Sequence, residues 1–123
     1  MRITCQTMQR LHEFGFAYTA RRKACGHAGR LTRMDKANVF RSQAFFRQIF
    51  DDAKAGYPDI EAGHSYVDAM AVDMGRRPWD YDVIVMENMF GDILSDLAGG
   101  LVGGMGMAAC GEIGDHNGLF QPA

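Results

Sequence analysis

The sequence predicts an α/β fold in which helices alternate with short strands. Apolar residues recur at helical spacing in four segments, and four short runs between and after them have the character of strands. Alternating strands and helices are typical of a layer with parallel pairing, which places functional sites at the carboxyl ends of the strands. The 123 residues amount to about one domain, and the 47% hydrophobic and 23% charged content excludes wholesale disorder.

The first helix is expected to begin after Thr4, which can cap it, and to extend to about Arg22. Its core stripe is predicted from the apolar residues at helical spacing, which are Met8, Leu11, Phe14 and Tyr18. A glycine-bearing turn then leads into a strand over residues 30–34. The basic residues Arg21, Arg22 and Lys23 are interpreted as a solvated helix end, and Arg30 and Arg33 as part of the strand after it.

A second helix is predicted from Ser42 as its cap, and a weak strand over residues 59–62. The expected core residues of this helix are Phe45, Phe46, Ile49, Phe50 and Ala53. Ser65 followed by Asp68 has the spacing of a capping box and would open a third helix, which ends before Pro78. The inward-facing residues of the third helix are expected to be Val67, Met70, Ala71 and Met74.

The clearest strand is predicted over residues 81–86, because its apolar run is β-branched and bounded by turn residues. A fourth helix should follow from about Phe90 to Leu101, and a last short strand over 107–110. The apolar stripe of this helix is predicted to comprise Ile93, Leu94, Leu97, Ala98 and Leu101. The loops after residues 34 and 86 would then lie at carboxyl ends of strands.

Charge and composition exclude several classes of function. The formal net charge of −2 argues against binding of nucleic acid or of an anionic membrane, and no apolar run approaches the roughly 18 residues of a membrane helix. The three cysteines form no metal-binding pair, so free thiols in a reducing, cytoplasmic setting are expected. The histidines show no metal-ligand spacing and are expected to be exposed or in turns: His12, His27, His64 and His116.

A few polar residues could carry chemistry. Asp92 and Asp96 are four residues apart, so a helix would place their carboxylates one turn apart on one face, where a Mg²⁺ or Mn²⁺ ion would relieve their repulsion. The alternative for Asp92 is an acid favoured by the helix dipole, and the alternative for Asp68 is a capping carboxylate. Lys36 follows a predicted strand and could serve as an acid or base, or could simply be solvated.

Three segments in this order resemble the β-decarboxylating dehydrogenases, the family of isopropylmalate, isocitrate, homoisocitrate and tartrate dehydrogenases. The segments are Met-Asp-Lys-Ala-Asn-Val at 34–39, Tyr-Val-Asp-Ala-Met at 66–70, and the run at 82–96 that contains Met-Phe-Gly-Asp-Ile-Leu-Ser-Asp. The resemblance runs from about Ile3 to Phe120. It implies an isopropylmalate-dehydrogenase-like central, second-domain fragment, with residues 1–123 as a single partial domain.

The resemblance also implies roles for single residues. Lys36 matches the catalytic lysine of the family, and Asn38 and Asn88 match polar contacts to substrate or cofactor. The implied ligands of a Mg²⁺ or Mn²⁺ ion are Asp68, Asp92 and Asp96. The implied reaction is oxidation and decarboxylation of a 2-hydroxy acid such as 3-isopropylmalate, isocitrate or tartrate with NAD or NADP.

In this family the active site is shared across a homodimer. One subunit is expected to supply the counterparts of Lys36 and Asp68, and the other those of Asp92 and Asp96. Because the family's substrate arginines precede the matched segment and its adenosine-binding loop follows it, we expect a fragment without appreciable turnover alone. The alternatives are a non-catalytic dimerisation module derived from the family and an unrelated metal-dependent hydrolase.

Overall fold

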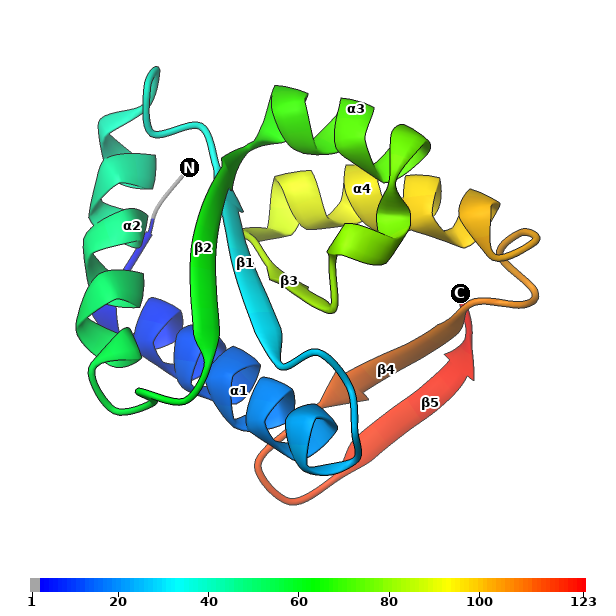
Figure 1. Cartoon of the computed structure of the whole chain (residues 1–123), viewed down its shortest axis with the longest axis horizontal. Coiled ribbons are helices and arrows are strands. Elements are labelled where there is room, and N and C mark those ends of the chain that lie inside the picture. The colour runs from blue at the N-terminus through cyan, green and yellow to red at the C-terminus, as the bar shows by residue number, and fades with distance from the viewer. Residues whose placement is uncertain (1–2) are drawn as a thin grey trace. The chain divides into compact units, whose positions relative to one another are not determined.

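The computed structural model describes residues 3–123, which form two compact units. The first unit extends to Glu87 and contains three helices, a 3₁₀ turn and three strands; the second begins at Asn88 and contains one helix and two strands. Figure 1 labels the helices α1–α4 and the strands β1–β5. Helices and strands alternate through the first unit, which confirms the predicted α/β class. The expected single partial domain over residues 1–123 stays a prediction.

The first unit is built on a three-stranded parallel sheet. β1 (Arg30–Asp35) lies in the centre, between β2 (Glu61–Tyr66) and β3 (Val83–Val85). The predicted strands are therefore present, but β2 begins later than expected and β3 is shorter. Residues 31–35 of β1 are all buried, so both faces of the central strand are covered. Since the strands are parallel, their carboxyl ends lie at the same edge of the sheet.

Three helices accompany this sheet. α1 (Cys5–Ala24) contacts α2 (Arg41–Lys54), β1 and β3, and α3 (Val67–Arg76) contacts β1 and β2 (Figure 1). The short 3₁₀ helix η1 (Pro78–Asp80) links α3 to β3. The end of α3 before Pro78 confirms the predicted break, because proline removes a backbone donor that a helix needs.

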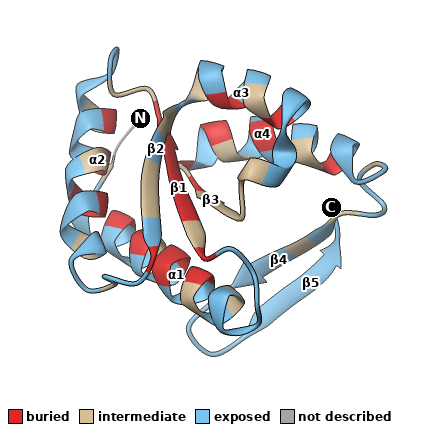
Figure 2. Cartoon of the chain, viewed as in Figure 1, coloured by how far each residue is buried: buried red, intermediate tan, exposed pale blue. Residues whose placement is uncertain are grey.

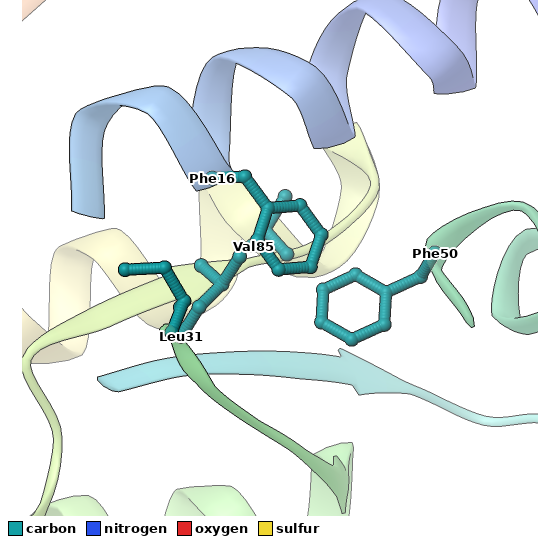
Figure 3. Close-up of a cluster of buried hydrophobic side chains, with 5 residues drawn as sticks. Phe16, Leu31, Phe50 and Val85 are labelled. Carbon is teal, nitrogen blue, oxygen red and sulfur yellow. The ribbon is translucent and has the colours of Figure 1, made fainter. Parts of the chain in front are cut away.

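A hydrophobic cluster joins α1, β1, α2 and β3. It comprises Phe16, Leu31, Phe50, Ile60 and Val85 (Figure 3). The Phe16 and Phe50 rings stack with centroids 5.0 Å apart. A second cluster of Met8, Phe46 and Ile49 extends the contact between α1 and α2. Burying side chains of this size contributes roughly 1.5–3 kcal/mol each, so these clusters fix the sheet against the two helices.

The predicted side-chain caps are wrong. Thr4 does precede α1, but its hydroxyl donates to the hydroxyl of Thr7 and makes no bond to a backbone N–H. Phe40, not Ser42, occupies the cap position of α2. Ser65 belongs to β2, and α3 starts directly after this strand, so no capping box forms. The cap positions of α2 and α3 are instead held by Phe40 and Tyr66, which are not the short oxygen-bearing side chains that cap a helix.

The buried face of α1 also differs from the predicted stripe. Phe14 and Tyr18 are exposed and stack on one another, with centroids 6.1 Å apart. The buried residues of this helix are Met8, His12, Gly15, Phe16 and Thr19. The Thr19 hydroxyl donates to the carbonyl oxygen of Gly15 at 2.7 Å, which satisfies it inside the fold. A pattern that counts apolar residues alone selects the neighbouring face, because polar residues share the buried one.

The other helix faces are predicted with mixed success. In α2, Phe46, Ile49 and Phe50 are buried as expected, but Phe45 is exposed. In α3 the buried residues are Met70 and Met74, whereas Ala71 is exposed. The residues that were correctly predicted to be buried are those whose helical spacing places them on the side facing the sheet.

The second unit contains α4 (Asn88–Leu101) and an antiparallel hairpin of β4 (Ala109–Ile113) and β5 (Gly118–Pro122). β4 starts two residues later than predicted, and β5 was not predicted. The hairpin residues are almost all exposed (Figure 2). Of the five residues in the predicted stripe of α4, only Leu94 is buried, so that prediction is largely wrong.

The helices and cysteines of the described residues bear on two further expectations. Within residues 3–123, no helix has both the length and the hydropathy to cross a bilayer. The cysteines of this region, Cys5, Cys25 and Cys110, are free thiols.

Candidate active site at the carboxyl edge of the parallel sheet

The sheet brings two of the predicted site residues together. Lys36 comes directly after β1, and Asp68 lies in the first turn of α3, which follows β2. The parallel register sets Asp35 opposite Tyr66, so these two strand ends lie side by side. The Lys36 Nζ atom donates to Asp68 Oδ1 at 2.7 Å. The fold thus makes neighbours of a lysine and a carboxylate that are 32 residues apart.

The two partners of this ion pair differ in exposure. The Lys36 side chain is 21% exposed, whereas the Asp68 side chain is 69% exposed. The hydrogen bond from Lys36 lowers the pKa of Asp68, and backbone N–H groups at the start of α3 act in the same direction. Asp68 is therefore an ionised carboxylate that still faces solvent, which leaves it able to accept a cation.

The turn that carries Lys36 is closed by backbone bonds. The Lys36 carbonyl oxygen accepts from the N–H groups of Val39 and Phe40, both at 3.0 Å. The Asp35 Oδ1 atom accepts from the N–H of Ala37 at 2.8 Å. Asn38 is exposed in this turn, two residues after Lys36. The turn therefore presents an ammonium and an amide at the same edge of the sheet.

A buried charged cluster lies beneath this edge, and sequence reasoning missed it. Arg33, in the predicted strand, is fully buried. Its Nε donates to His64 Nδ1 at 3.0 Å, and its guanidinium forms an ion pair with Asp35. Burial and the nearby charge of Arg47 lower the pKa of Arg33 to about 10.

The guanidinium of Arg33 lies over aromatic rings. Its carbon is 5.8 Å from the centroids of both Phe46 and Phe50. The alternation Leu-Thr-Arg-Met-Asp over 31–35 places Arg33 and Asp35 on one side of β1, because strand residues alternate between faces. That spacing was the available signal for a buried pair.

Of the two histidines packed near this cluster, one departs from expectation and one does not. His12 is fully buried in α1, with its ring centroid 4.5 Å from that of Phe46. Burial, together with the charge of Arg33, lowers its pKa to about 4, so it is neutral at physiological pH. His64 lies in β2, and its Nε2 is 3.2 Å from Asp51 Oδ1. His12 therefore belongs to the core, whereas His64 is exposed, as expected.

The second unit carries the other predicted ligands. Asp92 and Asp96 are exposed on α4, one turn apart, as the spacing predicts. The Asn88 amide donates to Asp92 Oδ2 at 3.0 Å. Over residues 3–123 of a single copy, no three His, Cys, Asp or Glu side chains gather closely enough to hold a metal ion. The donors nonetheless fit Mg²⁺ or Mn²⁺ chemically, because hard cations prefer carboxylate oxygens.

Comparison with known proteins assigns this arrangement to a family. The model of the isocitrate/isopropylmalate dehydrogenases matches residues 1–123. The chain is 43% identical to 3-isopropylmalate dehydrogenase of Aquifex aeolicus over 122 residues. This alignment covers 99% of this chain and 32% of that protein. It is 42% identical over 121 residues to 3-isopropylmalate/3-methylmalate dehydrogenase of Methanocaldococcus jannaschii, covering 98% of this chain and 36% of that protein.

Solved structures agree. The crystal structure of isocitrate dehydrogenase from Methylococcus capsulatus matches with a TM-score of 0.91 and 36% identity, over 98% of this chain and 35% of that one. A β-decarboxylating dehydrogenase from Thermococcus kodakarensis matches with a TM-score of 0.84, also at 36% identity and with the same coverage. The chain spans about a third of the length of these relatives. It belongs to the isocitrate/isopropylmalate dehydrogenase family, as the three sequence motifs predicted.

Proposed function

We propose that this chain supplies the catalytic lysine and cation-binding carboxylates of an enzyme that oxidises and decarboxylates a 2-hydroxy acid with NAD or NADP. The observation that carries the proposal is the 2.7 Å contact between Lys36 and Asp68 at the carboxyl edge of the sheet. The names of the relatives favour 3-isopropylmalate as the substrate. The expected cytoplasmic location is a further part of this proposal.

Each residue has a role that suits its chemistry. Asp68, Asp92 and Asp96 would hold Mg²⁺ or Mn²⁺, which supplies Lewis acidity toward the substrate's hydroxyl and carboxylate oxygens when bound. The Lys36 Nζ atom would carry the hydroxyl proton: paired with Asp68 it is an ammonium, so it must first release a proton to water before it can take one from the substrate. The amides of Asn38 and Asn88 would hydrogen-bond to substrate or cofactor.

A calorimetric titration of the chain with Mn²⁺ tests the cation site. Replacing any of the three proposed ligands, Asp68→Asn, Asp92→Asn or Asp96→Asn, should weaken binding at least tenfold, because each removes one anionic oxygen donor. Asp52→Asn, on the exposed side of α2, is the matched control and should bind as the unchanged chain does. Equal binding by all four variants would refute the ligand assignment.

We propose further that the site is completed by a second copy of the chain. α4 exposes an apolar stripe with a residue every four positions: Met89, Ile93, Leu97 and Leu101. An exposed apolar stripe of this kind marks an association surface. Asp92 and Asp96 each precede a stripe residue, so two stripes in contact would carry these acids to the border of the interface.

Sedimentation analysis tests this association. The unchanged chain should sediment as a dimer at micromolar concentration, and Leu97→Glu should shift it to a monomer because a charge would be buried in the stripe. Val72→Glu, on the exposed side of α3, is the control. A monomer at every concentration, or a dimer that Leu97→Glu leaves intact, would contradict the shared site.

A dimerisation module without chemistry is the second candidate, favoured by the exposed stripe of α4. The Mn²⁺ titration separates the two, because a module has no use for the three acids. A dimer that binds no Mn²⁺ would support the module. On either account we expect no appreciable NADH formation from 3-isopropylmalate, isocitrate or tartrate, since the matched relatives are about three times longer than this chain.

A further inference from the structure

Arg47 connects the two strand ends that carry Lys36 and Asp68. From α2 its Nη2 atom donates to Asp35 Oδ1 at 3.1 Å and its Nε to Asp35 Oδ2 at 3.4 Å. The same guanidinium lies over the ring of Tyr66, with its carbon 5.4 Å from the ring centroid. Asp35 is the last residue of β1, and Tyr66 is the last residue of β2.

The two residues that Arg47 contacts are close in sequence to the candidate site residues. Asp35 immediately precedes Lys36, and Tyr66 is two residues before Asp68. The Asp35 carboxylate also accepts from the N–H of Ala37, so the residues before and after Lys36 are linked by a hydrogen bond. A carboxylate that is fully buried cannot exchange these partners for water. One side chain of α2 therefore restrains the backbone from which both site residues project.

Arg33 is placed differently. It also pairs with Asp35, but it comes from the same strand, two residues earlier. It reaches β2 at His64 and lies over Phe46 and Phe50 of α2. Arg47, in contrast, contacts the last residues of the two strands, Asp35 and Tyr66. A planar guanidinium suits the position of Arg47 because it can donate in its plane to a carboxylate while its face lies against an aromatic ring.

We propose that Arg47 is a positioning residue that sets the distance between Lys36 and Asp68 through Asp35 and Tyr66. The catalytic meaning of this distance rests on the proposed function, whereas the restraint itself does not. Arg47 is not itself one of the proposed catalytic or cation-binding residues.

The test compares Arg47→Met with Arg47→Lys in the intact chain. Acetylation of Lys36 by acetic anhydride is measured by mass spectrometry at one pH, relative to Lys54 in the same molecule. Arg47→Met should raise the relative acetylation of Lys36 at least threefold, because the amine is released from Asp68. Arg47→Lys keeps a cation beside Asp35, so its relative acetylation of Lys36 should be within twofold of that of the unchanged chain. Arg77→Gln, which breaks the Arg77–Asp73 pair elsewhere, should change nothing.

Amide hydrogen exchange supplies a second measurement. The Ala37 amide should exchange at least tenfold faster in Arg47→Met and at the original rate in Arg77→Gln. If Arg47→Met does not fold, Tyr66→Leu removes the ring contact alone and should raise Lys36 acetylation about twofold. Unchanged acetylation in a folded Arg47→Met or in Tyr66→Leu would overturn the proposal.

The outcome can be separated from that of the proposed function. Mn²⁺ binding by the unchanged chain, with no response of Lys36 to Arg47→Met, would refute positioning and leave the function standing. A clear response of Lys36 in a chain that binds no Mn²⁺ would support positioning and refute the cation site.

Discussion

His12 is a neutral base in an apolar environment, and this makes the stability of the first unit depend on pH. Its ring lies between the rings of Phe46 and Phe50, with centroid distances of 4.5 and 5.3 Å. Burial, together with the charge of Arg33, lowers its pKa to about 4, and the charge of Asp51 opposes this shift. In the unfolded chain the same ring titrates near 6.5.

Stability should therefore fall as the pH falls from 6.5 toward 4. In this range the unfolded chain binds a proton on His12 that the folded chain does not, so protonation favours unfolding. The expected loss from this residue is about 2–3 kcal/mol between pH 7 and pH 4.5, which urea unfolding at the two pH values measures.

His12→Leu is the control for this prediction. It removes the titrating group and should flatten the pH dependence by the same amount, while a smaller slope remains because burial also lowers the pKa of His64. The same loss of stability on acidification in His12→Leu and in the unchanged chain would show that His12 does not titrate as described.

At the scale of elements, the contact between α1 and the sheet leaves room at one position. Gly15 is buried in the middle of α1, and a methyl group added there would meet Leu31 Cδ1 at 3.6 Å and Val85 Cβ at 3.7 Å. These are ordinary van der Waals distances. Because alanine also favours a helix over glycine, Gly15→Ala should raise the free energy of unfolding by about 0.5–1 kcal/mol.

Gly15→Val provides the comparison. Its two additional methyl groups would enter the contact with Leu31 and Val85, so it should lower the free energy of unfolding by about 1–3 kcal/mol. Urea unfolding of both variants measures the difference. A destabilising alanine would mean that α1 lies closer to the sheet than its distances indicate.

The elements also show what sequence can predict. Strands β1 and β3 and the break before Pro78 were predictable, because each depends on local residue type. The meeting of Lys36 and Asp68 followed from parallel pairing, since both come after adjacent strands. The buried Arg33 was not predictable from hydropathy, because its partners come from three separate elements.

The predictions of which helix faces are buried were partly wrong for a related reason. The stripe of α4 is periodic and apolar, and the pattern alone cannot distinguish a face covered within the unit from one left exposed. The roles of Asp92 and Asp96 stay predictions, because they require partners outside the single copy described. The sequence thus predicts where helices and strands occur better than it predicts which of their faces are covered.

At the scale of the whole molecule, the two units differ in how much they bury. The first unit holds the Phe16–Phe50 cluster, the cluster of Met8, Phe46 and Ile49, and strand β1, whose residues 31–35 are all buried. The second unit ends in a two-stranded hairpin whose large apolar residues Ile113, Leu119 and Phe120 are all at least half exposed. A two-stranded hairpin without a covered face is marginally stable in water. The two regions should therefore open with very different free energies.

Amide hydrogen exchange of the isolated chain should reveal this difference. The paired amides of β1 should exchange at least 100-fold more slowly than those of β4 and β5, relative to unstructured peptides, because opening β1 requires loss of the Phe16–Phe50 cluster. The α2 amides, in the same sample, report the protection of an ordinary packed helix. Protection of the hairpin equal to that of β1 would mean that another surface covers Ile113, Leu119 and Phe120 in solution. If that surface belongs to a second copy, the association involves the hairpin as well as α4. Leu97→Glu should then make the amides of β4 and β5 exchange faster.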